Sequence, residues 1–520
     1  MNQKKTIRDL LEYRGTETPD AVFGIYADEK ITCARMWQRV NQIANGLAVM
    51  GAGPGDRIAL MLANHPDHIF TVFAIASIGA VWVPINIHLK GAGLNYILEE
   101  SAPLGLIIDA KFWEQQQAGI DDLGIKKIVV RQDGDAQTPK GRIDFQQLIR
   151  SSTRLPETRP TQTELRCISF TSGTTGPPKG VFLTEQMLFA CARGAAAASD
   201  VQPGDVYLLW EPIYHNSGIQ MCILALMEPV RLIIISRFSA SRFWDQVRKH
   251  AVTKLHYLGG IVDILLKQPP GDHDRDHHIQ IAFGAGCRQE NWCEFEGRFG
   301  VRIHEAYGLT EASGFTTLNR TGKVGSVGKP LPDFEVKVVD PGGAALPAGQ
   351  MGEILTREKI SGLITKGYHK NPGATAGAIR DGWLHTGDLG FLDPDGDLFY
   401  VGRTKDCIRR RGENISAWEV ERVLNMHPEI IESAVIGVES EVGEQDVKVF
   451  LNTKPGSSPK PLEIIQWCET RMPYYQIPRY IDFVESFEKT PTQRIRKKEL
   501  STDLNGCWDL EKTGYKVDRS

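Results

Sequence analysis

Residues 167–180 read Cys-Ile-Ser-Phe-Thr-Ser-Gly-Thr-Thr-Gly-Pro-Pro-Lys-Gly, an apolar strand that runs directly into a loop of small and hydroxylated residues. From Thr171 to Gly180 the loop holds four hydroxyl residues, three glycines, two prolines and one lysine. Glycines let backbone N–H groups converge on phosphate oxygens, while hydroxyls and lysine add donors and charge. The stretch predicts a phosphate-binding loop, although a plain flexible connection can have the same composition.

Two common nucleotide-binding fingerprints do not fit the chain. Pro178 stands where the Walker A pattern requires glycine, and Gly180 stands where it requires serine or threonine. Gly284-Ala-Gly286 follows a predicted strand, but Gln289 occupies the position of the third Rossmann glycine. Neither a P-loop nor a dinucleotide site is expected.

Composition places the chain among ordinary globular proteins. It has 520 residues, 41% of them hydrophobic, and 60 Lys+Arg against 64 Asp+Glu give a net charge of −4. This balance gives no reason to expect nucleic acid or an anionic membrane as the main partner. The nine cysteines form no Cys-x-x-Cys pair, which fits a reducing compartment better than a disulfide scaffold. We expect a cytoplasmic protein.

One uncharged stretch, Ile69–Ile87, is 19 residues long, close to the length that spans a bilayer. Gly79 and Pro84 interrupt it. We therefore predict a buried helix to about Ser77 and a strand over Ala80–Val83, and no integral membrane segment. No apolar region of a secretory signal follows the basic N-terminus.

Hydrophobic periodicity predicts an α/β fold with mostly parallel sheets up to about residue 325. The spacing over Thr32–Met50 is helical, and strands are predicted at Asp56–Leu62, Leu104–Ile108, Arg166–Phe170, Val206–Leu209, Arg231–Ile235 and Ile279–Phe283. Beyond residue 325, short apolar runs at Phe334–Val339, Glu353–Thr356 and Leu398–Val401 alternate with Pro-Gly turns and predict a β-rich subdomain. Helices at Ala417–Asn425 and Leu462–Arg471, with strands at Glu432–Val438 and Val447–Leu451, predict a compact α+β terminal domain.

Further sequence blocks accompany the loop. They are Tyr307-Gly-Leu-Thr-Glu311, Trp383-Leu-His-Thr-Gly-Asp388, Gly402-Arg-Thr-Lys-Asp406, and Arg411–Ser416 followed by Glu419 and Glu421. With the loop they resemble, in order and over nearly the whole chain, the adenylate-forming superfamily of acyl-CoA synthetases, peptide-synthetase adenylation domains and luciferases. The resemblance implies an AMP-binding domain over residues 1–402, with the β-rich subdomain at about 325–402. A hinge at 403–405 that includes Lys405, and a small mobile domain over 406–520, would complete the chain.

The resemblance also implies roles for single residues. The phosphates of ATP would be held by Thr171, Ser172, Gly173, Thr174, Thr175, Gly176 and Lys179. The adenine and acyl side would be formed by Gly284, Ala285, Gly286, Ala306, Tyr307 and Gly308, with Tyr307 stacked on adenine. Thr310 would contact phosphate, Glu311 would hold Mg²⁺, and Asp388 and Arg403 would bind the ribose. Gly412 would line the channel for the thiol of coenzyme A, and Arg409–Arg411 is either a contact for the nucleotide of CoA or an ordinary basic patch.

The histidines fall into two groups, one candidate for the active site and several that are expected to have no functional role. His215 matches a position near the acyl carboxylate in the superfamily, and its alternative is a histidine satisfied within a turn. His273, His277 and His278 are expected in a solvated loop whose spacing fits no metal-site pattern, so no zinc is assigned.

The terminal block departs from the superfamily pattern P-x-T-x-x-G-K. Gln493 replaces its glycine, and Arg494 stands where its lysine belongs. Arginine is a planar fork and not a compact ammonium, so the exchange is not conservative. Three accounts of this exchange compete. Arg494 takes the role of the lysine with altered geometry, Lys497 or Lys498 takes that role, or adenylation is slow. We favour the first account. This block and the ending Cys507–Val517 resemble the carnitine/crotonobetaine-CoA ligase-like branch.

The implied function is that of an ATP-dependent acyl-CoA synthetase. A carboxylic acid would be activated as an acyl-adenylate with release of pyrophosphate, and CoA would then displace AMP, with ATP and Mg²⁺ required. Two alternatives stay open: transfer to a carrier-protein pantetheine, and a degenerate nucleotide binder without catalysis. No carrier domain follows in this sequence, which favours CoA. Residues around 214–218, 257–261 and 282–286 would suit a small, aromatic or medium-chain acid. Members of the superfamily are often dimers, so a homodimer is also an expectation.

Overall fold

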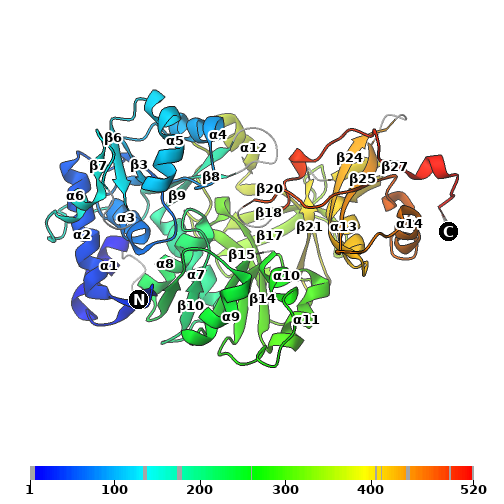
Figure 1. Ribbon diagram of the computed structural model, residues 1–520, viewed down its shortest axis with the longest axis horizontal. Helices are drawn as coiled ribbons and strands as arrows, with labels where there is room; N and C mark the ends of the chain where they lie inside the picture. The colour runs from blue at the N-terminus through cyan, green and yellow to red at the C-terminus, as the bar shows by residue number, and fades with distance from the viewer. Residues whose placement is uncertain are drawn as a thin grey trace.

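The computed structural model describes residues 6–132, 137–171, 178–258, 260–404, 407–410, 413–440, 445–472, 474–490 and 494–517. A large domain, coloured blue to yellow in Figure 1, lies beside a smaller orange and red one. The predicted fold class is confirmed: two sheets of mostly parallel strands, a β-rich subdomain and a terminal α+β domain are all present.

The first sheet carries the phosphate loop at its edge. It has seven strands in the order β7-β6-β5-β3-β4-β8-β9, and all pairs are parallel except β8 with β9. The strands are β3 Arg57–Met61, β4 Val81–Pro84, β5 Gly105–Asp109, β6 Lys127–Arg131, β7 Ile143–Asp144, β8 Leu165–Thr171 and β9 Lys179–Thr184. β8 and β9 are antiparallel neighbours, and the glycine-rich segment joins them in the sequence. Helices α3 Pro66–Ser77, α4 Gly91–Ser101, α5 Ala110–Asp122 and α6 Phe145–Ile149 connect the parallel strands.

The second sheet has nine strands, in the order β16-β15-β14-β13-β12-β10-β11-β1-β2. They are β1 Val22–Tyr26, β2 Glu29–Thr32, β10 Val206–Leu209, β11 Arg231–Ile234, β12 Lys254–Leu258, β13 Ile281–Ala285, β14 Arg302–Leu309, β15 Gly314–Asn319 and β16 Lys329–Pro330. The strands from β1 to β14 in this order are paired in parallel. The carboxyl ends of parallel strands share one edge, which is where α/β proteins bind ligands.

Helices fill the space between the two sheets. They are α1 Ile7–Glu17, α2 Cys33–Val49, α7 Glu185–Ser199 and α8 Asn216–Met227, while α9 Ala240–Lys249, α10 Gly260–Leu266 and α11 Gln289–Phe299 belong to the second sheet's other connections. The largest apolar cluster joins α2, α3, α7 and α8 to strands of both sheets. The predicted buried helix and strand within Ile69–Ile87 are confirmed as α3 and β4. In the part of the chain that the structure describes, no helix has the length and apolar character needed to span a membrane.

The β-rich subdomain forms a five-stranded sheet, order β17-β18-β20-β19 with β21 paired to β20. Its elements are β17 Phe334–Val339, β18 Gly352–Glu358, α12 Pro372–Ala378, β19 Ile379–Arg380, β20 Trp383–Leu392 and β21 Leu398–Arg403. The antiparallel register of β20 and β21 sets Asp388 opposite Arg403. The register therefore places opposite each other two residues to which the resemblance gives one shared role, the binding of the ribose.

The terminal domain has its own apolar core, with Val420, Leu424, Val449 and Ile464 among its fully buried members. Its elements are β22 Cys407–Arg410, β23 Glu413–Ser416, α13 Ala417–Asn425, β24 Ile430–Glu439, β25 Gln445–Thr453, α14 Pro461–Glu469, β26 Tyr480–Phe483 and β27 Trp508–Asp509. The predicted hinge residue Lys405 and the channel residue Gly412 lie outside the described residues.

Burial of α3 can be tested by removing one ring. Phe73 is fully buried, and its ring meets that of Phe23 edge-on at 6.3 Å between centroids. Phe73→Ala should lower the free energy of unfolding by about 3–5 kcal/mol, because it removes an aromatic contact and leaves a cavity. Chemical denaturation of the purified variants measures this. Val49→Ala is the control, since Val49 is 86% exposed and should change stability by less than about 0.5 kcal/mol. Equal small losses in both variants would contradict the buried placement.

Candidate active site

Three parts of the chain meet at one buried carboxylate. Asp388 of β20 is 2% exposed, and its Oδ2 accepts a 2.7 Å hydrogen bond from the hydroxyl of Tyr307 at the end of β14. Its Oδ1 lies 2.7 Å from Nε of Arg403, which β21 places opposite. The structure thus brings together three of the predicted nucleotide-binding residues.

Burial and charge act against each other at Asp388. Burial raises the pKa of this carboxyl, while the nearby positive charge of Arg403 opposes that rise. Burial also raises the pKa of Tyr307 well above the usual value, so the phenol stays a hydrogen-bond donor. The ring of Tyr307 stacks on Tyr400 at 5.9 Å. One ring face is therefore already covered by protein.

A second carboxylate lies in the short 3-10 helix η1, Thr310–Ala312, directly after β14. Glu311 Oε1 accepts a 3.0 Å hydrogen bond from the hydroxyl of Tyr368. The ammonium of Lys179 lies over the ring of the same tyrosine, 5.0 Å from its centroid. No role was predicted for Tyr368, because its neighbours Lys366, Gly367 and His369 form none of the recognised blocks.

The described ends of the phosphate loop are held by strand pairing. Thr171 pairs with Lys179 across β8 and β9, and the Thr171 hydroxyl donates to the Lys179 carbonyl at 3.4 Å. Lys179 therefore begins a strand, and its position is fixed by the sheet. The predicted phosphate ligands Ser172, Gly173, Thr174, Thr175 and Gly176 lie outside the described residues.

The turn after β13 is anchored by a buried acid that sequence reasoning missed. Glu305 of β14 is 4% exposed and accepts the N–H of Gly286 at 2.5 Å and that of Cys287 at 3.2 Å. The hydroxyl of Tyr257 donates to the same carboxylate. Burial raises the pKa of Glu305 to about 8. Its only signal in the sequence is a position two residues before Tyr307.

Close backbone approach explains two of the predicted glycines. A side chain at Gly284 would collide with the carbonyl oxygen of Tyr257, and one at Gly308 would collide with that of Gly314. Ala306 lies within β14 and is 1% exposed, and Ala285 is the last residue of β13. These residues pack the strand ends tightly, so the roles predicted for them toward a ligand stay predictions.

His215 immediately precedes α8, and its Nε2 is buried with no hydrogen-bond partner among the described residues. The alternative of a histidine satisfied within a turn is therefore disfavoured. Burial, and then the positive charge of Arg494, lower the pKa of His215 to about 4. The imidazole is neutral at pH 7, with one nitrogen left to meet a ligand.

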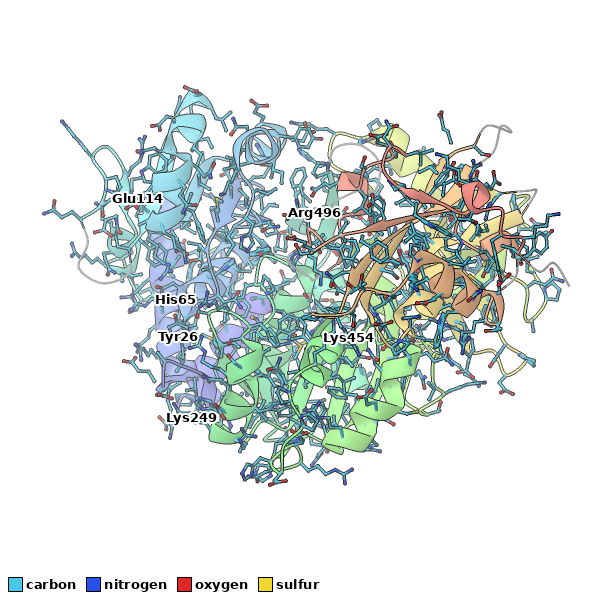
Figure 2. All side chains as sticks on the ribbon, turned by 45° about the vertical axis from the view of Figure 1, so that its right-hand side comes forward. Tyr26, His65, Glu114, Lys249, Lys454 and Arg496 are labelled. Carbon is cyan, nitrogen blue, oxygen red and sulfur yellow. The ribbon has the colours of Figure 1, made fainter. Side chains whose placement is uncertain are left out.

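Arg494 belongs to the terminal domain but acts on the large one. Its charge adds to burial in lowering the pKa of His215, and at Asp388 it opposes the rise in pKa that burial causes. The backbone N–H of Arg494 donates to the Thr490 hydroxyl at 3.1 Å, and its carbonyl accepts from Thr490 N–H at 2.7 Å. Figure 2 places Arg496, two residues farther on, on the side of the terminal domain that faces the large domain.

A buried polar network lies behind His215. Glu211 and His256 are both at most 1% exposed and are joined through Oε1 and Nδ1. Gln220 Nε2 lies 3.3 Å from His256 Nε2, and the Cys191 thiol donates to Gln220 Oε1 at 3.0 Å. Each member comes from a different element, so no local motif announces the network.

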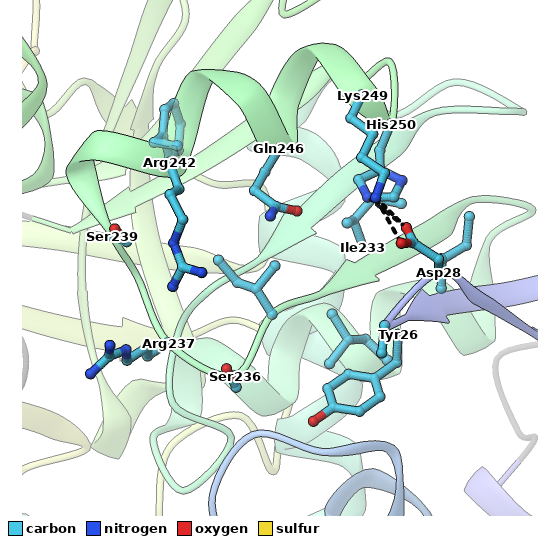
Figure 3. A pocket seen from close by; sticks show the side chains of 15 residues that line it. Tyr26, Asp28, Ile233, Ser236, Arg237, Ser239, Arg242, Gln246, Lys249 and His250 are labelled. Carbon is cyan, nitrogen blue, oxygen red and sulfur yellow. Dashed lines mark hydrogen bonds and ion pairs between the residues drawn. The ribbon is translucent and has the colours of Figure 1, made fainter.

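Two other polar features lie apart from these residues. A cavity of about 220 Å³ at the ends of β1 and β11 is lined by Arg237, Arg242 and His250, and by Lys249 paired with Asp28 at 2.6 Å (Figure 3). Among the described residues, no predicted site residue lines it.

The expectation of a solvated histidine loop is wrong for His277. Its ring stacks on Trp244 at 4.8 Å between centroids, because an imidazole offers a flat face to the indole.

Comparisons with known proteins agree with this geometry. A family model described as AMP-binding enzyme matches residues 11–369, and one described as AMP-binding enzyme C-terminal domain matches residues 419–494. The crotonobetaine/carnitine–CoA ligase of Salmonella agona (strain SL483) is 31% identical over 504 residues, covering 92% of this chain and 97% of that protein. The ligase of the same name from Escherichia fergusonii is 31% identical over 472 residues, covering 89% and 91%.

Solved structures share the fold. An anthranilate CoA ligase in complex with anthranoyl-AMP has a TM-score of 0.86 at 24% identity, covering 96% of this chain and 97% of its own. ATP-bound MatB from Rhodopseudomonas palustris has a TM-score of 0.85 at 24% identity, covering 95% and 98%. The predicted resemblance is confirmed at the level of the family and fold.

The proximity of Arg494 to His215 can be measured by titration. NMR of ¹³C-histidine-labelled protein should give His215 a pKa of about 4, with His215→Gln to identify its signal. Arg494→Gln removes one of the two causes, so the pKa of His215 should rise while staying below about 6.5. Because the unfolded histidine binds a proton first, His215 should lower stability as pH falls from about 6.5 towards 4. An unchanged pKa in Arg494→Gln would contradict the proximity.

Proposed function

This chain belongs to the AMP-binding enzyme family and is an acyl-CoA synthetase, and we propose that it works in two steps. The carboxylate of the acid attacks the α-phosphorus of ATP, and pyrophosphate leaves from that phosphorus. The thiol sulfur of CoA then attacks the acyl carbon, and AMP departs. The intermediate is needed because a free carboxylate has a poor leaving group.

The observation that carries the proposal is the joining of Tyr307, Asp388 and Arg403 into one buried contact. Two carboxylate oxygens held in place suit the paired hydroxyls of a ribose, which are hydrogen-bond donors. Arg403 lies 2.7 Å from Asp388 and would compensate the carboxylate when both are enclosed by the nucleotide. We assign the ribose to Asp388 and Arg403 and the adenine to the strand ends that carry Tyr307 and Gly284–Gly286.

We assign the phosphates to the segment that joins β8 and β9 in the sequence and to Lys179, the first residue of β9. Glu311 fits a Mg²⁺ ion. Carboxylate oxygens are the ligands that this ion prefers. Of the two carboxylate oxygens of Glu311, Oε1 accepts a hydrogen bond from Tyr368, and Oε2 accepts none from the described residues. When bound, the ion would neutralise phosphate charge so that an anionic acid can approach a polyanion. Thr310, one residue before, would add a hydroxyl donor to phosphate.

The acid is assigned to the region of His215. A neutral imidazole with a buried, unpartnered Nε2 can donate a hydrogen bond to a carboxylate without adding net charge. Arg494 would supply that charge, because it acts on both His215 and Asp388. Lys497 is held in the terminal domain by an ion pair with Glu421 at 2.7 Å, which supports Arg494 as the residue in the adenylation role.

The substrate and acceptor are named by a panel experiment. Pyrophosphate release with Mg·ATP should depend on the acid added, and a thioester should form only when CoA is present. The panel should hold betaine-type and aromatic acids, which the names of the similar ligases above indicate, together with dicarboxylic and medium-chain acids as further classes. Lys179→Ala should lose at least tenfold in kcat/KM, because it removes a phosphate charge, and Asp388→Ala should raise the KM for ATP.

Each other outcome of the panel has a defined meaning. Release without thioester would favour a carrier-protein acceptor over CoA. No ATP binding and no release with any acid would favour the degenerate nucleotide binder. Unchanged activity in both Lys179→Ala and Asp388→Ala would contradict the site assignment.

The role of Arg494 separates from that of its neighbours by three variants. Arg494→Lys should retain or raise the rate of adenylate formation, because it restores a compact cation at the same place. Arg494→Gln should lower that rate about 100-fold or more, while Lys497→Gln should change it little. Single-turnover pyrophosphate release measures the step. A large loss in Arg494→Lys would show that the planar fork is itself needed, and a loss confined to Lys497→Gln would move the role to that lysine.

A further inference from the structure

Tyr368 is fixed by the strand that follows the phosphate loop. Its neighbours pair with β9 outside the main ladder: Phe182 N–H donates to the Gly367 carbonyl at 3.2 Å, and His369 N–H donates to the Gly180 carbonyl at 2.7 Å. Val181 and Tyr368 form the bridge between these bonds. The backbone of Tyr368 is therefore fixed to β9 at Val181, two residues after Lys179.

The same segment also fixes the helix that carries Glu311. Thr365 N–H donates to the Glu311 carbonyl at 2.8 Å, and the Thr365 hydroxyl donates to Phe182 at 2.8 Å. Residues 365–369 thus connect β9 with η1, although the two lie far apart in sequence. The side chain of Tyr368, which belongs to this segment, contacts both the Glu311 carboxylate and the Lys179 ammonium.

The side chain of Tyr368 contacts both a carboxylate and an ammonium, two groups whose opposite charges attract each other. Its hydroxyl donates to Glu311 Oε1 at 3.0 Å, and its ring lies under the Lys179 ammonium at 5.0 Å. No ion pair joins Lys179 to Glu311 among the described residues. A direct pair would neutralise both charges, and each would then be less able to meet an ion or a phosphate.

We propose that Tyr368 is a positioning residue that holds the Glu311 carboxylate and the Lys179 ammonium apart and oriented, so that Mg²⁺ and the ATP phosphates meet them together. The role rests on the proposed function. A phenol that donates to a carboxylate restricts its rotation while leaving Oε2 open, and the ring face attracts the ammonium without quenching its charge. Both effects reduce the side-chain entropy lost when the ligand binds.

Two substitutions divide these contacts. Tyr368→Phe keeps the ring beneath Lys179 and removes only the donor to Glu311. Tyr368→Leu removes both contacts. Calorimetry of ATP binding without acid, in Mg²⁺ and separately in EDTA, reads each contact without turnover. Tyr515→Phe is the matched control, since Tyr515 donates to Glu469 at 2.6 Å in the terminal domain.

Tyr368→Phe should bind ATP in EDTA within about twofold of the unaltered enzyme, and the gain in affinity on adding Mg²⁺ should shrink about tenfold. Tyr368→Leu should show the same loss and also bind ATP in EDTA about two- to fivefold more weakly, because the ring contact is gone. Tyr515→Phe should behave as the unaltered enzyme does.

A full Mg²⁺ gain in Tyr368→Phe would overturn the role, as would an equal loss in Tyr515→Phe. If Tyr368→Leu does not fold, Tyr368→Phe alone decides. Failure of the unaltered enzyme to bind ATP would overturn the proposed function itself, which is a different outcome from ATP binding that ignores Tyr368.

Discussion

The carboxylate of Asp388 is buried between a phenol and a guanidinium, and this contact joins the nine-stranded sheet to the β-rich subdomain. Tyr307 comes from the nine-stranded sheet, whereas Asp388 and Arg403 come from neighbouring strands of the subdomain. An unpaired buried carboxylate would be costly, and pairing it with both partners offsets that cost. The subdomain must therefore dock so that Asp388 meets Tyr307, and the same docking brings together the residues to which we assign the nucleotide.

Much of the fold follows from local patterns because each pattern is short and self-contained. The buried helix α3 and strand β4 were predictable from a long apolar run broken by glycine, and α13 was predictable to its ends at Ala417 and Asn425. Strand β13 was placed two residues early, since its carboxyl end runs into Gly284 and Ala285, which carry little strand propensity. Its pairing with β12, where Gly284 lies opposite Tyr257 and Ala285 opposite Leu258, extends it that far, and its composition does not.

The residues that sequence reasoning missed make contacts with residues that are distant in the sequence. Glu305 anchors a turn 19 residues away, His256 meets Glu211 across 45 residues, and Tyr368 reaches Glu311 across 57. None of these contacts leaves a local period or a spacing in the sequence. The recognised blocks supplied the groups assigned to the ligand, whereas the groups that orient them come from neighbouring strands. Short sequence motifs identify the residues assigned to ligand binding, whereas the residues that orient them become visible only in the folded structure.

The positive charge of the site is divided between two domains, and that division has a consequence for the chemistry. Lys179 and Arg403 belong to the large domain and its subdomain, so a movement of the terminal domain would leave both in place. Arg494 belongs to the terminal domain and reaches His215 and Asp388 only when the two domains are docked as they are here. If the terminal domain rotates between the two proposed steps, the charge that favours attack on ATP leaves with it. Removing that cation would raise the pKa of His215, because one of the two causes that lower it would be gone, so domain movement would change the electrostatics of the site.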